Sequence, residues 1–234
     1  MASAYCFRET HAHADHLTSS QYLKSQLGGN VPVCIGARIA QVQNTFASVY
    51  GFDNPAFFQN TFDIYFEDDF EFALGGTTCR VMHLPGHTPD HIGYVLGGAI
   101  FTGDSIFNPD VGSARADFPG GSVTDLYSSI QRLLSFPEDS LLFVGHDYPA
   151  PGNRTPIPCT TVREQKDAWN KKDKTEFIEW RQQRDATLSA PRLLHPSLQV
   201  NIRAGKLPLK DESGRAWLKT PLRGVDRCWP NCAY

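Results

Sequence analysis

The sequence predicts an α/β protein in which strands and helices alternate and pack in layers. Short apolar runs bounded by glycine alternate with stretches whose apolar residues recur at helical spacing. The chain shows no internal repeat, and its 234 residues suit one globular unit with an extension. A hydrophobic fraction of 41% and a charged fraction of 20% allow a buried core and argue against a disordered chain. These observations favour an α/β or α+β layered domain.

Strands are predicted where apolar runs are short and end at turn residues. The segment VPVCIG reads as a buried strand, and a longer apolar run further on is divided by Gly97–Gly98, which predicts a hairpin turn. The expected strands are residues 31–36, 78–84, 93–102 and 141–144.

Helices are predicted where the apolar spacing changes to about 3.6 residues. The third predicted helix is amphipathic, and its core-facing residues are Leu126, Ile130, Leu133 and Leu134. The fourth is charged and is expected to be exposed. The expected helices are residues 14–27, 37–50, 122–135 and 176–188.

A proline-rich loop divides the chain. Residues 149–158 contain four prolines and a glycine, so they are expected to separate a strand-rich part from a helical part. We therefore predict a metal-binding domain over residues 1–150 and a helical extension of the same unit over residues 151–222. The tail 223–234 has no periodicity, and we expect it to be disordered.

Charge and hydropathy exclude several classes of partner. The formal charge of −3 comes without a basic stripe, which argues against nucleic acid and anionic membranes. No apolar run is long enough to span a membrane, and residues 1–10 lack the apolar core of a secretory signal. We expect a soluble cytoplasmic protein. A mitochondrial location stays open if a transit peptide is missing from this sequence, and so does a homodimer.

The cysteines are expected to be reduced. None of the six forms a CxxC pair, and without a secretory signal a disulfide framework is disfavoured. Cys228 and Cys232 are the pair considered for a bridge, although the compartment argument favours free thiols there too.

The chemistry is concentrated in four motifs. The run T-H-A-H-A-D-H holds His11, His13, Asp15 and His16 within six residues, and alternation along an extended segment would turn positions 11, 13 and 15 to one side. The other candidate ligands lie at or after predicted strand ends: His87 in L-P-G-H-T-P-D-H, Asp104 in F-T-G-D-S and His146 in V-G-H-D-Y. Imidazole and carboxylate together suit zinc, iron or manganese. Gly86 and Gly103, beside the ligands, would let the backbone turn sharply.

The four motifs together resemble the metallo-β-lactamase superfamily, from about residue 8 to about residue 222. The resemblance implies an αβ/βα sandwich with the metal site at one edge of two sheets. In that superfamily the histidine run follows several strands and a helix, whereas here it begins at residue 11. We therefore expect an N-terminally incomplete sandwich with an uncovered sheet edge and apolar face.

Two further stretches, residues 112–121 (GSARADFPGG) and 181–208, resemble the persulfide dioxygenases, also called sulfur dioxygenases. This resemblance implies oxidation of glutathione persulfide to sulfite in hydrogen sulfide detoxification. It implies one Fe(II) per chain, held by His11, His87 and Asp104 in the two-histidine, one-carboxylate arrangement.

The remaining candidate ligands, His13, Asp15, His16 and His146, would orient waters and ligands. Outside the metal shell, Arg115 is a candidate for binding a substrate carboxylate, with a salt bridge to Asp117 as the alternative. Tyr148 and His146 are candidates for hydrogen bonds to substrate or bound oxygen.

Two alternatives stay open. One is a dinuclear zinc hydrolase of glutathione thioesters, like glyoxalase II, since every ligand for two metals is present. The other is an inactive truncated remnant that binds metal without turnover.

Overall fold

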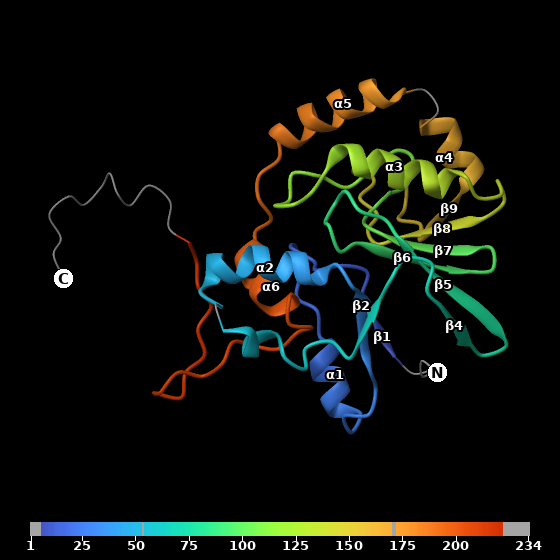
Figure 1. Cartoon of the computed structure of the whole chain (residues 1–234). Coiled ribbons are helices and arrows are strands. Elements are labelled where there is room, and N and C mark those ends of the chain that lie inside the picture. Colours follow the sequence, from blue (N-terminus) through green and yellow to red (C-terminus); the bar gives the residue numbers. More distant parts are fainter. Residues whose placement is uncertain (1–5, 53, 170–171, 222–234) are drawn as a thin grey trace, which may run out of the picture.

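A computed structural model describes residues 6–52, 54–169 and 172–221 as two sheets packed between helices (Figure 1). A parallel three-stranded sheet contains β1 (Phe7–Arg8), β2 (Val33–Gly36) and β3 (Ile64–Phe66) in that order. A six-stranded sheet has the order β4-β5-β6-β7-β8-β9. Its strands are Glu71–Leu74, Thr77–His83, Ile92–Leu96, Ala99–Gly103, Leu141–Val144 and Cys159–Thr161.

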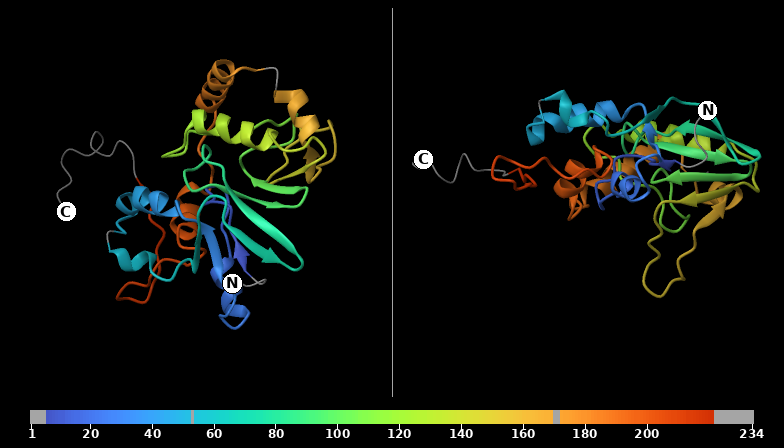
Figure 2. Two further views of the ribbon diagram at one scale, coloured as in Figure 1. Left: turned by 45° about the vertical axis from the view of Figure 1, so that its right-hand side comes forward. Right: turned by 90° about the horizontal axis from the view of Figure 1, so that it is seen from below.

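Helices cover the outer faces of both sheets, which gives the expected αβ/βα sandwich (Figures 1 and 2). Helices α3 (Val123–Leu134), α4 (Val162–Trp169) and α5 (Lys174–Ala186) bury the outer face of the six-stranded sheet, and all four predicted inward residues of α3 are buried. Around the smaller sheet lie α1 (Ser20–Gln26), α2 (Ile39–Tyr50), the 3₁₀ helix η1 (Pro55–Phe58) and α6 (Leu194–Asn201).

The strand directions gather loop ends at one edge of the large sheet. Neighbouring strands pair antiparallel from β4 to β7, whereas β7 and β8 pair parallel through the crossover helix α3. Strands β5, β7 and β8 therefore run in the same direction, and their carboxyl ends share an edge. Functional side chains are commonly carried by the loops that leave such an edge.

The inner face of the large sheet is covered unevenly. Near β4 to β6 it packs against the small sheet through Phe66, Phe72 and Tyr94. On β7 and β8, Phe101 is 42% exposed and Leu141 is 38% exposed, although both lie on the face opposite buried Ile100 and Leu142. Among the described strands, β1 pairs only with β2. The inner face at β7 and β8 therefore leaves apolar side chains partly exposed.

The helix predicted for residues 14–27 is shorter than expected. It begins at Ser20, because residues 10–19 form an irregular loop whose groups are hydrogen-bonded to the side chains of Glu9 and Asn201. Seven elements were not predicted from the sequence: β1, β3, β4, β9, η1, α4 and α6. The predicted tail and the Cys228–Cys232 pair lie outside the described residues. None of the helices in the described ranges is long and apolar enough to cross a membrane.

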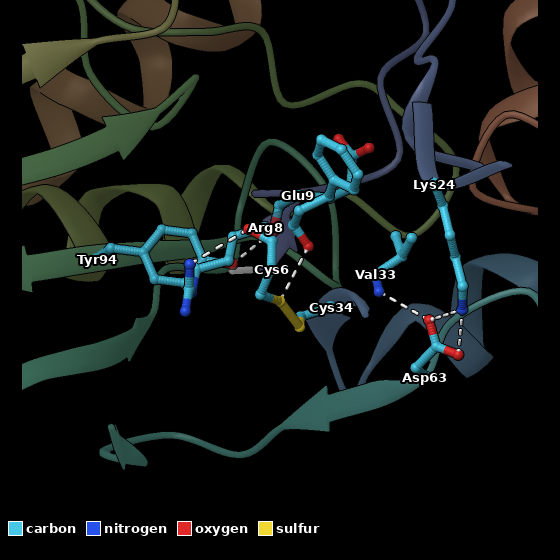
Figure 3. The surroundings of a disulfide bond; sticks show 9 residues. Cys6, Arg8, Glu9, Lys24, Val33, Cys34, Asp63 and Tyr94 are labelled. Atoms are coloured by element: carbon cyan, nitrogen blue, oxygen red, sulfur yellow. Dashed lines mark hydrogen bonds and ion pairs between the residues drawn. A yellow bond between two sulfur atoms is a disulfide. The ribbon is translucent and has the colours of Figure 1, made fainter. Parts of the chain in front are cut away.

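The prediction of six reduced cysteines is wrong for one pair. Cys6 and Cys34 form a disulfide (Figure 3). Cys79 and Cys159 are free. The two cysteines are 28 residues apart, but pairing of β1 with β2 brings them together, a proximity that sequence spacing could not reveal. The bridge links the start of β1 to β2, the neighbouring strand of the small sheet, a few residues before the histidine run.

Reducing this disulfide should destabilise the chain. Closing a loop of this length lowers the entropy of the unfolded state, which stabilises the folded state by about 3.6 kcal/mol. We expect the oxidised protein to lose about that much unfolding free energy in reductant, measured by urea denaturation. The Cys6→Ser variant should show no response to reductant. An equal response in both proteins would contradict the bridge.

Candidate metal centre

The candidate ligands come from four loops that meet where the two sheets adjoin. His11, His13, Asp15 and His16 lie between β1 and α1, whereas His87 follows β5. Asp104 and His146 follow the parallel neighbours β7 and β8. The structure therefore brings together all seven residues that the sequence singled out as ligands.

The Asp104 carboxylate lies at the centre of this cluster. Its Oδ2 atom is 3.7 Å from Nε2 of His11, 3.9 Å from Nε2 of His87 and 3.7 Å from Nε2 of His146. These separations are too long for hydrogen bonds. An ion with bonds of about 2.1 Å would separate two tetrahedral ligands by roughly 3.4 Å, close to what is found.

Two of these imidazoles have one nitrogen engaged and the other facing Asp104. His87 Nδ1 donates to the carbonyl oxygen of Arg115 at 2.7 Å, and His11 Nδ1 shares a hydrogen bond of 3.0 Å with the Thr10 hydroxyl. Within the described residues, Nε2 of His11 and Oδ1 of Asp104 are buried without a hydrogen-bond partner. Buried unpaired polar atoms are costly, and a bound cation would give Nε2 of His11 a partner.

Asp15, His16 and His146 form a second group, whose members are bonded to one another. Asp15 Oδ1 lies 3.1 Å from His16 Nδ1, and Asp15 Oδ2 lies 3.3 Å from His146 Nε2. These hydrogen bonds lower the pKa of Asp15 and raise the pKa values of both histidines. The group is partly exposed, in contrast to buried His11 and Asp104.

His13 lies between the two groups. Its ligand atom is within 4.8 Å of those of His11 and Asp104, and also of those of Asp15 and His16. Burial lowers its pKa to about 3, which keeps the ring neutral and able to bind metal. Its Nε2 lies 3.8 Å from Glu9, whose carboxylate also accepts hydrogen bonds from the Thr18 and Ser20 hydroxyls.

Two supporting residues were missed as functional by the sequence analysis. His91 is fully buried and stacks on His11 at 4.6 Å; its Nε2 accepts the Asp104 backbone N–H at 3.0 Å. Its Nδ1 can then donate to the Ser105 hydroxyl at 3.2 Å. Asp90 accepts the Ala12 backbone N–H at 2.8 Å. Both follow His87 in G-H-T-P-D-H, but a lone histidine near a motif carries little signal.

Two glycines make room for the Asp104 loop. Gly103 has φ +52°, and a Cβ there would lie 2.8 Å from the His91 ring. A Cβ on Gly145 would lie 2.3 Å from Asp104 Oδ1. A side chain at either position would displace the loop that carries the central carboxylate.

The Arg115 side chain forms the salt bridge allowed by the sequence. Its guanidinium pairs with Asp117 at 2.5 Å and donates to the Ser189 carbonyl at 2.7 Å, while its own carbonyl receives His87 Nδ1. Helix α5 holds the same loop, since Arg181 donates to the Ser113 carbonyl and Asp185 accepts the Ala116 N–H, each at 3.0 Å.

Tyr148 lies at the outer side of the site. Its ring stacks on His146 at 5.3 Å, and the residue is 61% exposed. Beside the ligands a cleft of about 430 Å³ is lined by Thr10, His13, His16, Asp104 and His146, and by apolar Phe101, Phe143, Val144 and Pro158.

Comparison with known proteins identifies the family. Residues 9–146 match the sequence profile of the Metallo-beta-lactamase superfamily, and the chain belongs to that superfamily. It is 44% identical over 220 residues to Glyoxylase B2 of Dictyostelium discoideum, covering 92% of this chain and 75% of that protein. It is 42% identical over 221 residues to the Beta-lactamase hydrolase-like protein of Xylella fastidiosa strain 9a5c, covering 93% of this chain but only 51% of that protein. The chain thus spans about half the length of this second relative.

Solved structures agree with the family. ETHE1 from Myxococcus xanthus is similar with a TM-score of 0.68 and 28% identity, over 85% of this chain and 76% of that one. TTHA1623 in a di-iron-bound form is similar with a TM-score of 0.51 and 26% identity, over 70% of this chain and 75% of that one.

The Gly145→Ala variant should lose metal affinity. Its new Cβ would push against Asp104 Oδ1, and overpacking of this kind costs about 1–3 kcal/mol. We expect at least about tenfold weaker Zn²⁺ binding in competition with a chelator, as seen when the surroundings of a ligand are disturbed. The control is Gly98→Ala, because Gly98 lies in the β6–β7 turn with no atom within 4 Å of a new Cβ. Equal affinity in the two variants would refute the role of Gly145.

Proposed function

We propose that the chain is a mononuclear iron persulfide dioxygenase that oxidises glutathione persulfide to sulfite and releases the thiol. Three motif groups support this proposal: the histidine run, the Asp104 and His146 motifs, and residues 112–121. The similarity to ETHE1 of Myxococcus xanthus over 85% of the chain fits the same family.

The observation that carries the proposal is the contrast between the two groups of candidate ligands. His11 and His87 place their Nε2 atoms 3.7 and 3.9 Å from Oδ2 of Asp104, and Nε2 of His11 is buried without a hydrogen-bond partner among the described residues. Asp15, His16 and His146 instead satisfy one another through hydrogen bonds. A single ion bound by His11, His87 and Asp104 would account for the arrangement of the first group. It would leave the hydrogen bonds within the second group intact.

Ferrous iron at this position would supply adjoining open positions at which persulfide sulfur and dioxygen react. Residues of the chain would keep the ligand side chains in position and transfer protons. The Arg115 carbonyl, which can only accept, fixes the tautomer of His87, and the Thr10 hydroxyl is bonded to Nδ1 of His11. His146, bonded to Asp15, lies 3.7 Å from the central carboxylate and is suited to exchange a proton with a substrate there.

The surroundings favour a thiol-derived substrate reached from the cleft. Phe101, Phe143 and Val144 form an apolar wall beside the ligands, which would exclude water from one side of the reacting group. Exposed Tyr148 stacks on His146 and would contribute a hydroxyl at the entrance. Because the Arg115 guanidinium is engaged by Asp117, we assign its contribution to its carbonyl oxygen.

A second candidate is a dinuclear hydrolase of glutathione thioesters. Asp104 is shared by both ligand groups, so a second ion held by Asp15, His16 and His146 would complete a bridged pair. The similarity to Glyoxylase B2 and to di-iron TTHA1623 favours this reading. Hydroxyacylglutathione hydrolase GloC of Haemophilus influenzae is also similar, 34% identical over 147 residues.

Metal content and turnover should be measured together on anaerobically purified protein. We expect about one iron per chain, with oxygen uptake in the presence of glutathione persulfide and no hydrolysis of a glutathione thioester. Zinc or iron in pairs, with thioester hydrolysis and no oxygen uptake, would replace the dioxygenase by the hydrolase.

Two variants separate the ligand groups. The His87→Ala variant should lose bound iron and oxygen uptake, because a ligand is removed. The His16→Ala variant should keep about one iron per chain with affinity about 10–100-fold weaker, the range found for residues around the ligands. In a dinuclear enzyme, His16→Ala would instead halve the metal content. Iron analysis on both variants, with circular dichroism to show folding, decides between them.

A further inference from the structure

The side chain of Asn201, at the end of α6, is bonded to the backbone of the histidine loop. Its Nδ2 donates to the carbonyl oxygens of His13 and His16, both at 2.7 Å, and its Oδ1 accepts the Thr18 N–H at 2.9 Å. The residue is 2% exposed, so these bonds are shielded from water. We propose that Asn201 is a positioning residue that sets the backbone on which His13, Asp15 and His16 are carried.

The loop depends on an outside partner for its shape. Residues 12–19 contain neither strand nor helix, so their backbone groups lack the regular partners that secondary structure provides. The two carbonyls bonded to Asn201 lie on either side of Asp15, and the N–H of Thr18 closes the turn before α1. One amide therefore fixes both ends of the segment that carries three candidate ligands.

The amide itself is held in place by a buried helix end. Leu198, Val200 and Ile202 are at most 1% exposed, and the Ile202 carbonyl accepts a hydrogen bond from the Gln43 side chain at 2.9 Å. The Ala204 carbonyl accepts the Gln21 N–H at 2.9 Å, which joins the turn after α6 to the start of α1. A rigid support of this kind is what a positioned metal ligand requires.

This role lies outside the part of the chain that matches the family profile. The match covers residues 9–146, whereas Asn201 belongs to the C-terminal extension. The extension therefore contributes to the candidate centre through Asn201 without supplying a ligand. The inference rests on the proposed metal chemistry, but it concerns metal affinity and holds for one ion or two.

The same helix offers a matched control. Gln199 is also fully buried and also makes three hydrogen bonds to backbone groups, namely the carbonyls of His195 and Lys219 and the N–H of Lys219. None of these groups belongs to the histidine loop. Asn201→Leu and Gln199→Leu thus remove comparable bonding from one helix, but only the first affects the candidate ligands.

The test measures Zn²⁺ affinity by competition with a chromophoric chelator, together with thermal unfolding of the metal-free proteins. We expect similar losses of thermal stability in both variants, but affinity at least about tenfold weaker only in Asn201→Leu. Equal affinities in the two variants, or a wild-type chain that binds no Zn²⁺, would overturn the proposal. If Asn201→Leu does not fold, Asn201→Ser against Gln199→Ser gives the same comparison, and equal affinities there would also overturn it.

Failure of the proposed function has a different signature. If the wild-type protein binds metal but neither takes up oxygen nor hydrolyses a thioester, both proposed reactions are excluded. The affinity difference between the Asn201 and Gln199 variants would be unaffected by that result.

Discussion

The buried carboxylate of Asp104 is the group around which the candidate centre is organised. A buried carboxylate is stable as an anion only if positive charge lies close by. Burial raises the pKa of Asp104, as expected for such a group. The surrounding imidazoles cannot all supply that charge, because burial lowers the pKa values of His11, His13 and His91. A bound cation would meet this requirement. Asp104 is surrounded by His91, Gly103 and Gly145. Their packing would hold one carboxylate oxygen of Asp104 among several imidazole nitrogens.

Two parts of the fold position the candidate ligands around Asp104. The six-stranded sheet brings the loops after β5, β7 and β8 to one edge, which positions His87, Asp104 and His146. The remaining ligands depend on an irregular loop, which needs side chains as partners for its backbone. The C-terminal helices supply them: α6 bonds to the histidine loop, and α5 bonds to the loop whose Arg115 carbonyl orients His87. Helices α5 and α6 thus support the loops that carry candidate ligands.

Local sequence patterns predicted much of this arrangement. They did not predict contacts between residues that lie far apart in the sequence. Alternation and helical spacing located β8 and α3 to within a residue, and the four motifs contained every residue found in the cluster. The start of α1 was predicted six residues too early, because the loop before it owes its shape to Asn201, far along the chain. The Cys6–Cys34 bridge was missed for a similar reason, since strand pairing creates it. His91 escaped notice because its role lies in stacking on His11 and accepting one backbone N–H, neither of which leaves a spacing pattern.

The choice between one ion and two turns on the hydrogen bonds of Asp15. If Asp15 stays bonded to His16 and His146, these bonds raise the pKa values of both histidines, and neither histidine nitrogen in those bonds is free to bind metal. A second ion must displace those protons and break both bonds. An ion beside His11 would break no such bond there, because Nε2 of His11 has no hydrogen-bond partner among the described residues. The two positions therefore differ in the hydrogen bonds that metal binding would have to replace.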